Sequence, residues 1–225
     1  MSMPSILSIP SILSIIAILL ALALAAVLAN EFARHRLLRA IARLVLKLYN
    51  RLETRGREHV PATGALIVAS NHESWLDAVF LGAAIPRLIH WLAAAEYFEV
   101  RYLRWIMNLF GTIRIERGRG SPEPFRRARE ALAAGRVIGI FPEGHMSTSG
   151  DLRLFKGGIA LLAEDARAPI LPVALTGAFE VWGAHLRFPR PRKVRVRIGP
   201  PIATAGLSRD EILARVETAI RQLLQ

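Results

Sequence analysis

The sequence predicts an α/β fold, a layered domain whose central, mostly parallel sheet is flanked by helices, with hydrophobic and amphipathic helices before it at the N-terminus. From residue 53 onward, short apolar runs alternate with segments of helical period, which is typical of parallel strands joined by helices. A long uncharged run precedes this region. The length of 225 residues suits one domain and an appendage better than two full domains.

The N-terminal segment 6–29 carries no charge over 24 residues. At about 1.5 Å per residue it reaches about 36 Å, enough to cross a hydrocarbon core of about 30 Å or to dip into one leaflet. A cleaved signal peptide is a weaker alternative, because residues 1–5 hold no basic side chain. Basic residues follow the segment, so the positive-inside rule predicts that the chain beyond residue 30 lies on the cytoplasmic side of the inner membrane.

Residues 31–52 are predicted to form a basic amphipathic helix. Basic residues every four positions form one stripe, made of Arg39, Arg43, Lys47 and Arg51, and aliphatic residues form the opposite side. A second basic block, 187–197, holds six basic residues and no acid. Both basic segments could simply form a solvated surface. Because a predicted membrane segment precedes them, contact of their basic residues with anionic lipid headgroups is the favoured interpretation. We therefore predict a membrane anchor over 1–52 and a second domain over 53–225.

The composition excludes several classes of protein. A net charge of +12 would also suit nucleic acid. However, aromatic residues make up only 7% and no helix-turn-helix, RNP or zinc-finger pattern occurs, so we predict no nucleic-acid partner. The chain has no cysteine, which excludes disulfides, thiolate nucleophiles and cysteine-ligated zinc and suits a reducing compartment.

The elements of the second domain follow from apolar periodicity and from capping signals. Strands are predicted over 65–69, 88–93, 137–141, 169–175 and 193–198, the last with alternating apolar residues. A helix from about Ser74 to Ala84 follows the first strand. Helices over 121–134, capped by Ser121 and ended by Gly135, and over 155–166 come next. Ser208 and Glu211 form a capping box that opens a last helix ending at Leu224.

Two polar loops follow strands of this predicted sheet, 70–77 and 142–151. The carboxyl ends of parallel strands meet at one edge of a sheet, so we expect His72 and Glu143 to face the same cleft. Histidine is the side chain best suited to take a proton near neutral pH. Asp77 can orient it only across a helix N-terminus, because five residues within a helix leave two side chains about 140° apart.

Each of these features also has a simpler explanation. The histidine and aspartate could be a structural pair, residues 141–144 a mere turn, and Asn71 only a cap for the following helix. A metal site built from His72, Asp77 and Glu143 is a further alternative, although the other histidines show no paired spacing.

Four short motifs occur along the chain in the same order as the four motifs of the glycerolipid acyltransferases, which this sequence resembles. They are Asn71-His72-x4-Asp77, Gly111-x-Ile113-x3-Arg117, Phe141-Pro142-Glu143-Gly144 and Leu171-Pro-Val-Ala-Leu175. The resemblance covers about residues 53–200 and is strongest to the bacterial 1-acylglycerol-3-phosphate (lysophosphatidate) acyltransferases.

The resemblance implies a membrane-bound enzyme that acylates a lysophospholipid. His72 would deprotonate the free hydroxyl, which attacks the thioester of acyl-CoA or acyl-carrier protein, and Asp77 would orient His72. The co-substrate is this thioester, with no cofactor, no metal and no covalent acyl-enzyme. Substrate contacts would come from Arg117, Glu143, Gly144 and Lys156, with Arg117 on the acceptor phosphate, although Arg114 or Arg119 could serve instead.

One departure from the family pattern affects the acceptor. The third motif continues as His145-Met146-Ser147 where the family usually has Thr-Arg-Ser, so one expected phosphate contact is missing. The resemblance predicts 1-acyl-sn-glycerol-3-phosphate as the acceptor, giving phosphatidic acid, and this departure makes lysophosphatidylethanolamine or another lysolipid the alternative. A membrane-anchored basic binding protein without chemistry is the non-enzymatic alternative.

Overall fold

The computed structural model describes residues 30–116 and 122–225, and the chain divides into two units after Ile41. The predicted membrane segment 6–29 lies outside the described residues. Helix α2 (Glu31–Tyr49) ends three residues before the predicted limit, and Arg51 then adopts a left-handed conformation with φ of 48°. None of the helices within 30–116 and 122–225 is long and apolar enough to cross a membrane.

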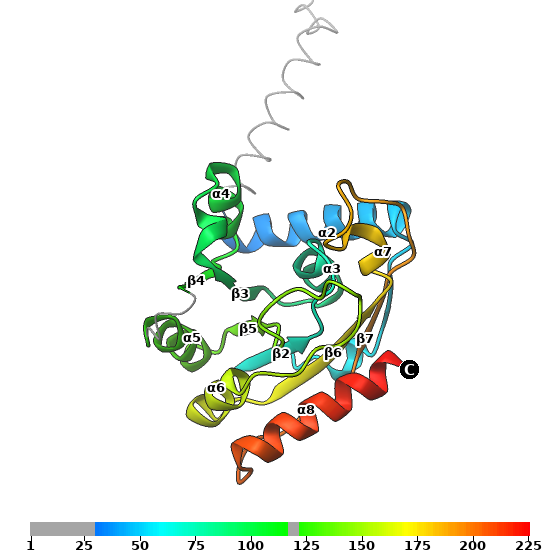
Figure 1. Ribbon diagram of the computed structural model, residues 1–225. Helices are drawn as coiled ribbons and strands as arrows, with labels where there is room; N and C mark the ends of the chain where they lie inside the picture. The colour runs from blue at the N-terminus through cyan, green and yellow to red at the C-terminus, as the bar shows by residue number, and fades with distance from the viewer. Residues whose placement is uncertain (1–29, 117–121) are drawn as a thin grey trace, which may run out of the picture. The chain divides into compact units, whose positions relative to one another are not determined.

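The described part of the second unit contains a seven-stranded sheet, in the order β1-β7-β6-β2-β5-β3-β4 (Figure 1). Every neighbouring pair is parallel except β6 with β7, so the predicted, mostly parallel sheet is confirmed. The short edge strands β1 and β4 escaped prediction, since three residues show no periodicity. The strands are β1 (Glu53–Arg55), β2 (Leu66–Ser70), β3 (Ile89–Ala94), β4 (Ile113–Ile115), β5 (Val137–Ile140), β6 (Ile170–Thr176) and β7 (Arg195–Ile198).

The predicted helices of the second domain are confirmed except at some ends, whereas α4, α7 and the two 3₁₀ helices were not predicted. Ser208 Oγ accepts from the Glu211 N–H and a Glu211 carboxylate oxygen accepts from the Ser208 N–H, which confirms the predicted capping box. The predicted cap Ser121 lies outside the described residues, and Phe155 precedes its helix as a buried core residue. The helices are α3 (Asp77–Ala84), α4 (Arg101–Leu109), α5 (Glu123–Ala133), α6 (Gly158–Ala166), α7 (Phe179–Trp182) and α8 (Arg209–Leu224), with 3₁₀ helices η1 (Arg57–His59) and η2 (Ala95–Phe98).

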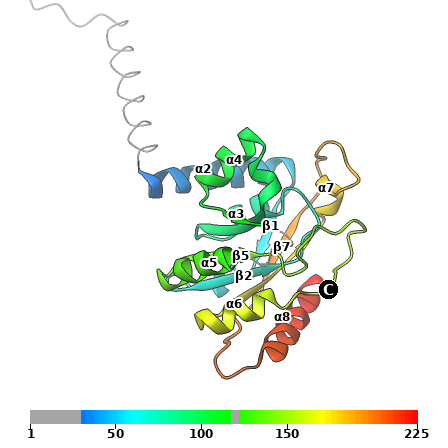
Figure 2. The same cartoon turned by 60° about the vertical axis from the view of Figure 1, so that its left-hand side comes forward.

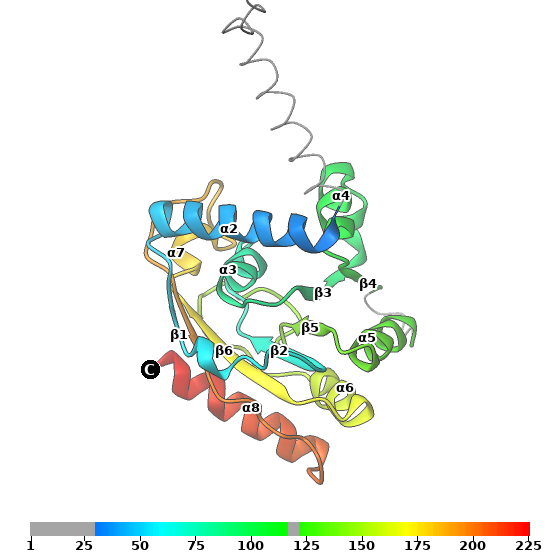
Figure 3. The same ribbon diagram turned by 180° about the vertical axis from the view of Figure 1, so that it is seen from behind.

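Helices lie on both faces of the sheet (Figures 1 and 3), and an apolar core lies on each face. Helices α3 and α7, with Leu46 of α2, pack on one face, and α5, α6 and α8 pack on the other. Every residue of β2 is buried, because alternate side chains such as Leu66 and Ile67 enter opposite cores. Burial on both faces explains why this strand is a continuous apolar run in the sequence.

Gly139 in β5 makes room for the indole of Trp91 on the neighbouring strand β3. A Cβ atom at position 139 would lie 2.5 Å from the Trp91 ring and 2.6 Å from Ile89. Real atoms do not approach so closely, so only glycine lets the indole lie flat across β5 at this point.

We predict that Gly139→Ala destabilises the fold by about 1–3 kcal/mol, because the new methyl group displaces a packed indole. Urea unfolding with an unchanged m-value would measure this loss. Gly82→Ala is the matched control: Gly82 lies inside α3 with open space around its would-be Cβ, so alanine should stabilise the helix slightly. Equal effects of the two substitutions would contradict this explanation.

Candidate active site

The two polar loops meet at the carboxyl ends of β2 and β5, which are neighbours in the sheet. The His72 backbone N–H donates to Glu143 Oε1 over 2.7 Å, and the Ser147 N–H donates to the His72 carbonyl over 2.7 Å. The predicted placement of His72 and Glu143 at one edge is therefore confirmed. The bonds between loops hold the backbone of His72 in place, while its side chain is 24% exposed.

Asp77 lies directly against the imidazole of His72, with 2.8 Å between Nδ1 and Oδ2. The same carboxylate oxygen accepts from the backbone N–H groups of Glu73 and Ser74. Asp77 is the first residue of α3, which begins three residues later than predicted, so the pair spans the helix N-terminus as the spacing requires. Because a carboxylate only accepts, Nδ1 donates to it, and the ring nitrogen Nε2 is left as an acceptor.

The carboxyl group of Asp77 is fully buried. Burial raises the pKa of Asp77, and the hydrogen bonds from His72, Ser74 and Glu73 oppose that rise. The arrangement stabilises a positive charge on His72 when the imidazole takes a proton.

The imidazole of His72 is the first ring of a stack of three, followed by the rings of Phe141 and Trp91. The Phe141 ring lies 4.1 Å from the imidazole at an interplanar angle of 15°, and the Trp91 ring lies 4.8 Å from Phe141 at 9°. Neither aromatic residue is among the site residues predicted from the sequence. The one sequence feature that could have placed Phe141 in the site is its position directly before the Pro-Glu-Gly turn.

Glu143 joins the two loops through both of its carboxylate oxygens. Oε1 accepts from the His72 N–H and Oε2 accepts from the Arg153 N–H over 2.9 Å. The side chain is buried, and this burial raises the pKa of Glu143, partly offset by the two N–H bonds. The geometry thus gives Glu143 a positioning role; substrate contact, as the resemblance implies, stays a prediction.

Asn71 and Glu73 fasten the loop 70–77 to β6 and to the turn after it. Asn71 Oδ1 accepts from the Leu175 N–H and Nδ2 donates to the Leu175 carbonyl, so the explanation of Asn71 as a helix cap is wrong. Glu73 Oε1 accepts from the N–H groups of Ala178 and Phe179. Burial, and after it the negative charge of Asp77, raises the pKa of Glu73 to about 8. Glu73 went unnoticed in the sequence because a lone glutamate in a polar loop is ordinary.

The predicted phosphate-binding residues are only partly described. Arg117 lies outside the described residues, whereas Arg114 is an exposed residue of β4 paired with Glu99 at 3.3 Å. Gly144 has φ of +74°, and a Cβ there would lie 2.8 Å from Lys156 Nζ. Lys156 is exposed and its Nζ lies 3.4 Å from His145 Nδ1, so Gly144 and Lys156 stand together at the rim beside Glu143.

The geometry speaks against the metal-site alternative. Glu143 uses both carboxylate oxygens on backbone N–H groups, and Asp77 directs one oxygen at His72 and at two further N–H groups. Within the described ranges, no three His, Cys, Asp or Glu side chains are grouped so as to hold a metal ion.

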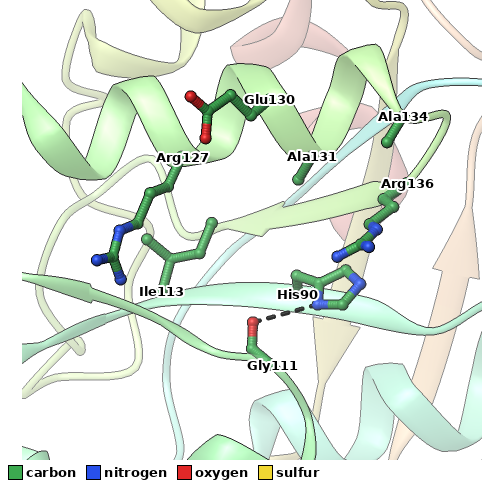
Figure 4. Close-up of a pocket in the computed structure, with 8 residues that line it drawn as sticks. All are labelled: His90, Gly111, Ile113, Arg127, Glu130, Ala131, Ala134 and Arg136. Atoms are coloured by element: carbon green, nitrogen blue, oxygen red, sulfur yellow. Dashed lines mark hydrogen bonds between the residues drawn. The ribbon is translucent and has the colours of Figure 1, made fainter. Parts of the chain in front are cut away.

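A separate pocket of about 300 Å³ lies at the other end of the strands, where β3, β4 and β5 begin (Figure 4). His90 at the start of β3 donates through Nδ1 to the Gly111 carbonyl over 3.1 Å, and Arg136 stands just before β5. Parallel strands run from this end toward His72, so the pocket is not part of the site.

Comparison with known proteins identifies relatives of this chain. The family model described as Acyltransferase matches residues 51–176. A Bacillus subtilis protein named 1-acyl-sn-glycerol-3-phosphate acyltransferase is 27% identical over 81% of this chain and 91% of its own length. A Pseudomonas aeruginosa protein named lyso-ornithine lipid O-acyltransferase is 30% identical over 76% of this chain and 72% of its own length.

The fold also matches a solved structure. The 1-acyl-sn-glycerophosphate acyltransferase from Thermotoga maritima superposes with a TM-score of 0.77, covering 85% of this chain and 78% of that one. The two sequences are 22% identical, so this comparison establishes the fold alone.

We predict that Glu73→Gln removes part of the pH dependence of stability. The folded chain holds the Glu73 proton up to about pH 8, whereas the ordinary pKa is 4.5, so ionisation favours unfolding between these values. The wild-type free energy of unfolding should therefore fall relative to that of Glu73→Gln as pH rises from about 5 to about 8, by up to about 1.4 kcal/mol per pH unit.

Urea unfolding at several pH values would measure this difference between the two proteins. Asp77 and Glu143 are present in both, so their contributions largely cancel. Substituting the exposed Glu58 by glutamine is the matched control. A constant difference between wild type and Glu73→Gln across this pH range would contradict the buried, protonated state of Glu73.

Proposed function

This chain belongs to the acyltransferase family, and we propose that it transfers a fatty acyl group from a thioester to the free hydroxyl of 1-acyl-sn-glycerol-3-phosphate, giving phosphatidic acid. The observation that carries the proposal is the 2.8 Å contact between His72 Nδ1 and Asp77 Oδ2, on a loop held at the open edge of the sheet. The family assignment speaks against a binding protein without chemistry.

The proposed reaction uses His72 as a general base. Nε2 takes the proton from the acceptor hydroxyl while its oxygen attacks the thioester carbonyl and forms the new C–O bond. The tetrahedral intermediate then collapses, the C–S bond breaks, and the proton passes from the imidazolium to the departing thiolate. Asp77 stabilises the imidazolium between these steps. The aromatic stack under the ring supports this role because it limits rotation of the imidazole.

The donor is proposed to be acyl-CoA or acyl-carrier protein, with no further cofactor. Both donors are acidic, and the chain carries a net charge of +12, which would favour their approach. The exposed Leu44 and Leu48 of α2, directly preceded in the sequence by the exposed Arg43 and Lys47, support contact with anionic lipid headgroups. We place this contact at the cytoplasmic face of the inner membrane, because basic residues follow the uncharged segment.

A different lysolipid acceptor is the second candidate. His145 and Met146 replace the residues that usually follow the third motif, and the Pseudomonas aeruginosa relative is named for a lyso-ornithine lipid. A panel of lysolipids, incubated with purified full-length protein and labelled oleoyl or palmitoyl thioesters, distinguishes the two. Preference for lysophosphatidate supports the first candidate, and faster acylation of a zwitterionic lysolipid supports the second.

We predict that His72→Ala keeps the fold and its membrane attachment but shows no acyl transfer, and that Asp77→Asn lowers kcat by at least about 100-fold. Neither change removes apolar core packing, so circular dichroism should be unchanged for both variants. His90→Ala removes an imidazole at the opposite edge of the sheet and should retain activity. Turnover of His72→Ala near the wild-type rate would overturn the assignment of the base.

We predict that Arg117→Ala mainly raises the KM for lysophosphatidate and changes kcat little, because the lost contact binds the phosphate and not the reacting atoms. Arg114→Ala and Arg119→Ala are parallel variants, and the variant with the largest rise in KM identifies the arginine that binds the phosphate. Initial rates over a range of acceptor concentrations provide the measurement. An unchanged KM in Arg117→Ala would exclude this residue from phosphate binding.

A further inference from the structure

Helix α4 turns its apolar side toward the outside of the domain. None of its residues is buried, and Tyr102 and Trp105 are 67% and 68% exposed. Tyr102, Trp105 and Ile106 are spaced three and four positions apart, so they form one stripe along the helix. A helix of a soluble domain normally packs such a stripe into the core, so its exposure here indicates a contact surface.

The opposite side of α4 holds the helix in place. Arg104 Nε donates to the Phe98 carbonyl over 2.6 Å, a partly buried contact. Leu103 and Met107 are the half-buried apolar residues on that side. The two large aromatic residues therefore do not serve to attach α4 to the domain.

The exposed stripe continues into the loop 70–77, here called the catalytic loop because of the role proposed for His72. Trp75, three residues after His72 and 49% exposed, meets Tyr97 edge to face at 6.0 Å between ring centroids. Tyr97 belongs to η2, which leads into α4. The three views show α4 on the side of the sheet that carries α3 (Figures 1, 2 and 3). The exposed apolar residues of this region, here called the α4 patch, are Trp75, Val79, Val100, Tyr102, Trp105 and Ile106.

The chemistry of the α4 patch fits the interface of a lipid bilayer. Tyrosine and tryptophan interleaved with arginine are typical of side chains at the headgroup level. Residues 97–114 contain three arginines and one glutamate, a net charge of +2, which complements anionic headgroups. A protein partner would have to bury these cations or pair each of them with an acid.

We propose that the α4 patch lies in the headgroup region of an anionic bilayer and places the His72 edge of the sheet at the membrane surface. Trp75 belongs both to the patch and to the catalytic loop, so lipid held at the patch stands next to the site. That this lipid includes the acceptor rests on the proposed function, whereas the docking itself rests on the exposure and charge of α4.

The absence of cysteine allows a direct test in the full-length chain. Tyr102→Cys and Trp105→Cys, each labelled with a nitrobenzoxadiazole fluorophore, are reconstituted in phosphatidylcholine–phosphatidylglycerol vesicles. We expect blue-shifted emission and strong quenching by lipids that carry a nitroxide near the headgroup. Gln222→Cys on the exposed surface of α8 is the matched control and should stay unquenched. Labels at 102 and 105 that are unquenched by lipid overturn the proposal, including the case in which protein covers them.

A second measurement separates docking from chemistry. The double variant Tyr102→Ala/Trp105→Ala should acylate long-chain lysophosphatidate in vesicles at least about fivefold more slowly than wild type, and a short-chain, monomeric lysophosphatidate within about twofold. Equal losses with both acceptors would indicate a damaged site and contradict docking. Lipid quenching without acylation of any lysolipid would instead overturn the proposed function and leave the docking intact.

Discussion

The site depends on the hydrogen bonds between two loops, above all the one from the backbone N–H of His72 to the carboxylate of Glu143, beside which the Ser147 N–H donates to the His72 carbonyl. Parallel pairing of β2 with β5 brings the loops to the same edge, but it does not fix their conformations. Glu143 does so by accepting from both sides, because its second oxygen holds the Arg153 N–H of its own loop. The imidazole is thereby oriented through its backbone as well as through Asp77.

This edge of the sheet contains three buried carboxyl groups in a chain of strongly positive net charge. Burial raises the pKa of Glu73, Asp77 and Glu143 alike. Backbone N–H donors compensate the carboxyl groups of Glu73 and Glu143, whereas His72 is the main compensating partner of Asp77, ahead of two backbone N–H groups. Buried carboxyl groups with a raised pKa lower the stability of the fold when they ionise, and such groups are often found at functional sites. Many basic residues are exposed instead, and in the proposed mechanism they would meet acidic donors and lipid headgroups.

The arrangement of the domain also suits a substrate that remains in a membrane. One face of the sheet carries α5, α6 and α8, whose apolar sides are buried in the second core. The region of α4 and the catalytic loop instead leaves large aromatic side chains exposed, with arginines beside them. The site and this exposed surface share one loop, so orientation at a membrane and access to His72 are linked in the proposed mechanism.

The sequence alone determined the fold class, because β2 and β5 are apolar on both faces and their polar loops mark strand ends. It also determined the His72–Asp77 pair, whose spacing has a use only across a helix N-terminus. Tertiary structure decided what depends on contacts distant in the chain: the bond from Asn71 to Leu175, the bonds from Glu73 to Ala178 and Phe179, and the stack of His72, Phe141 and Trp91. The short strands β1 and β4 exist only through their neighbours, since three residues carry no pattern of their own. Periodicity reports which side of an element is buried, but not which atoms it meets there.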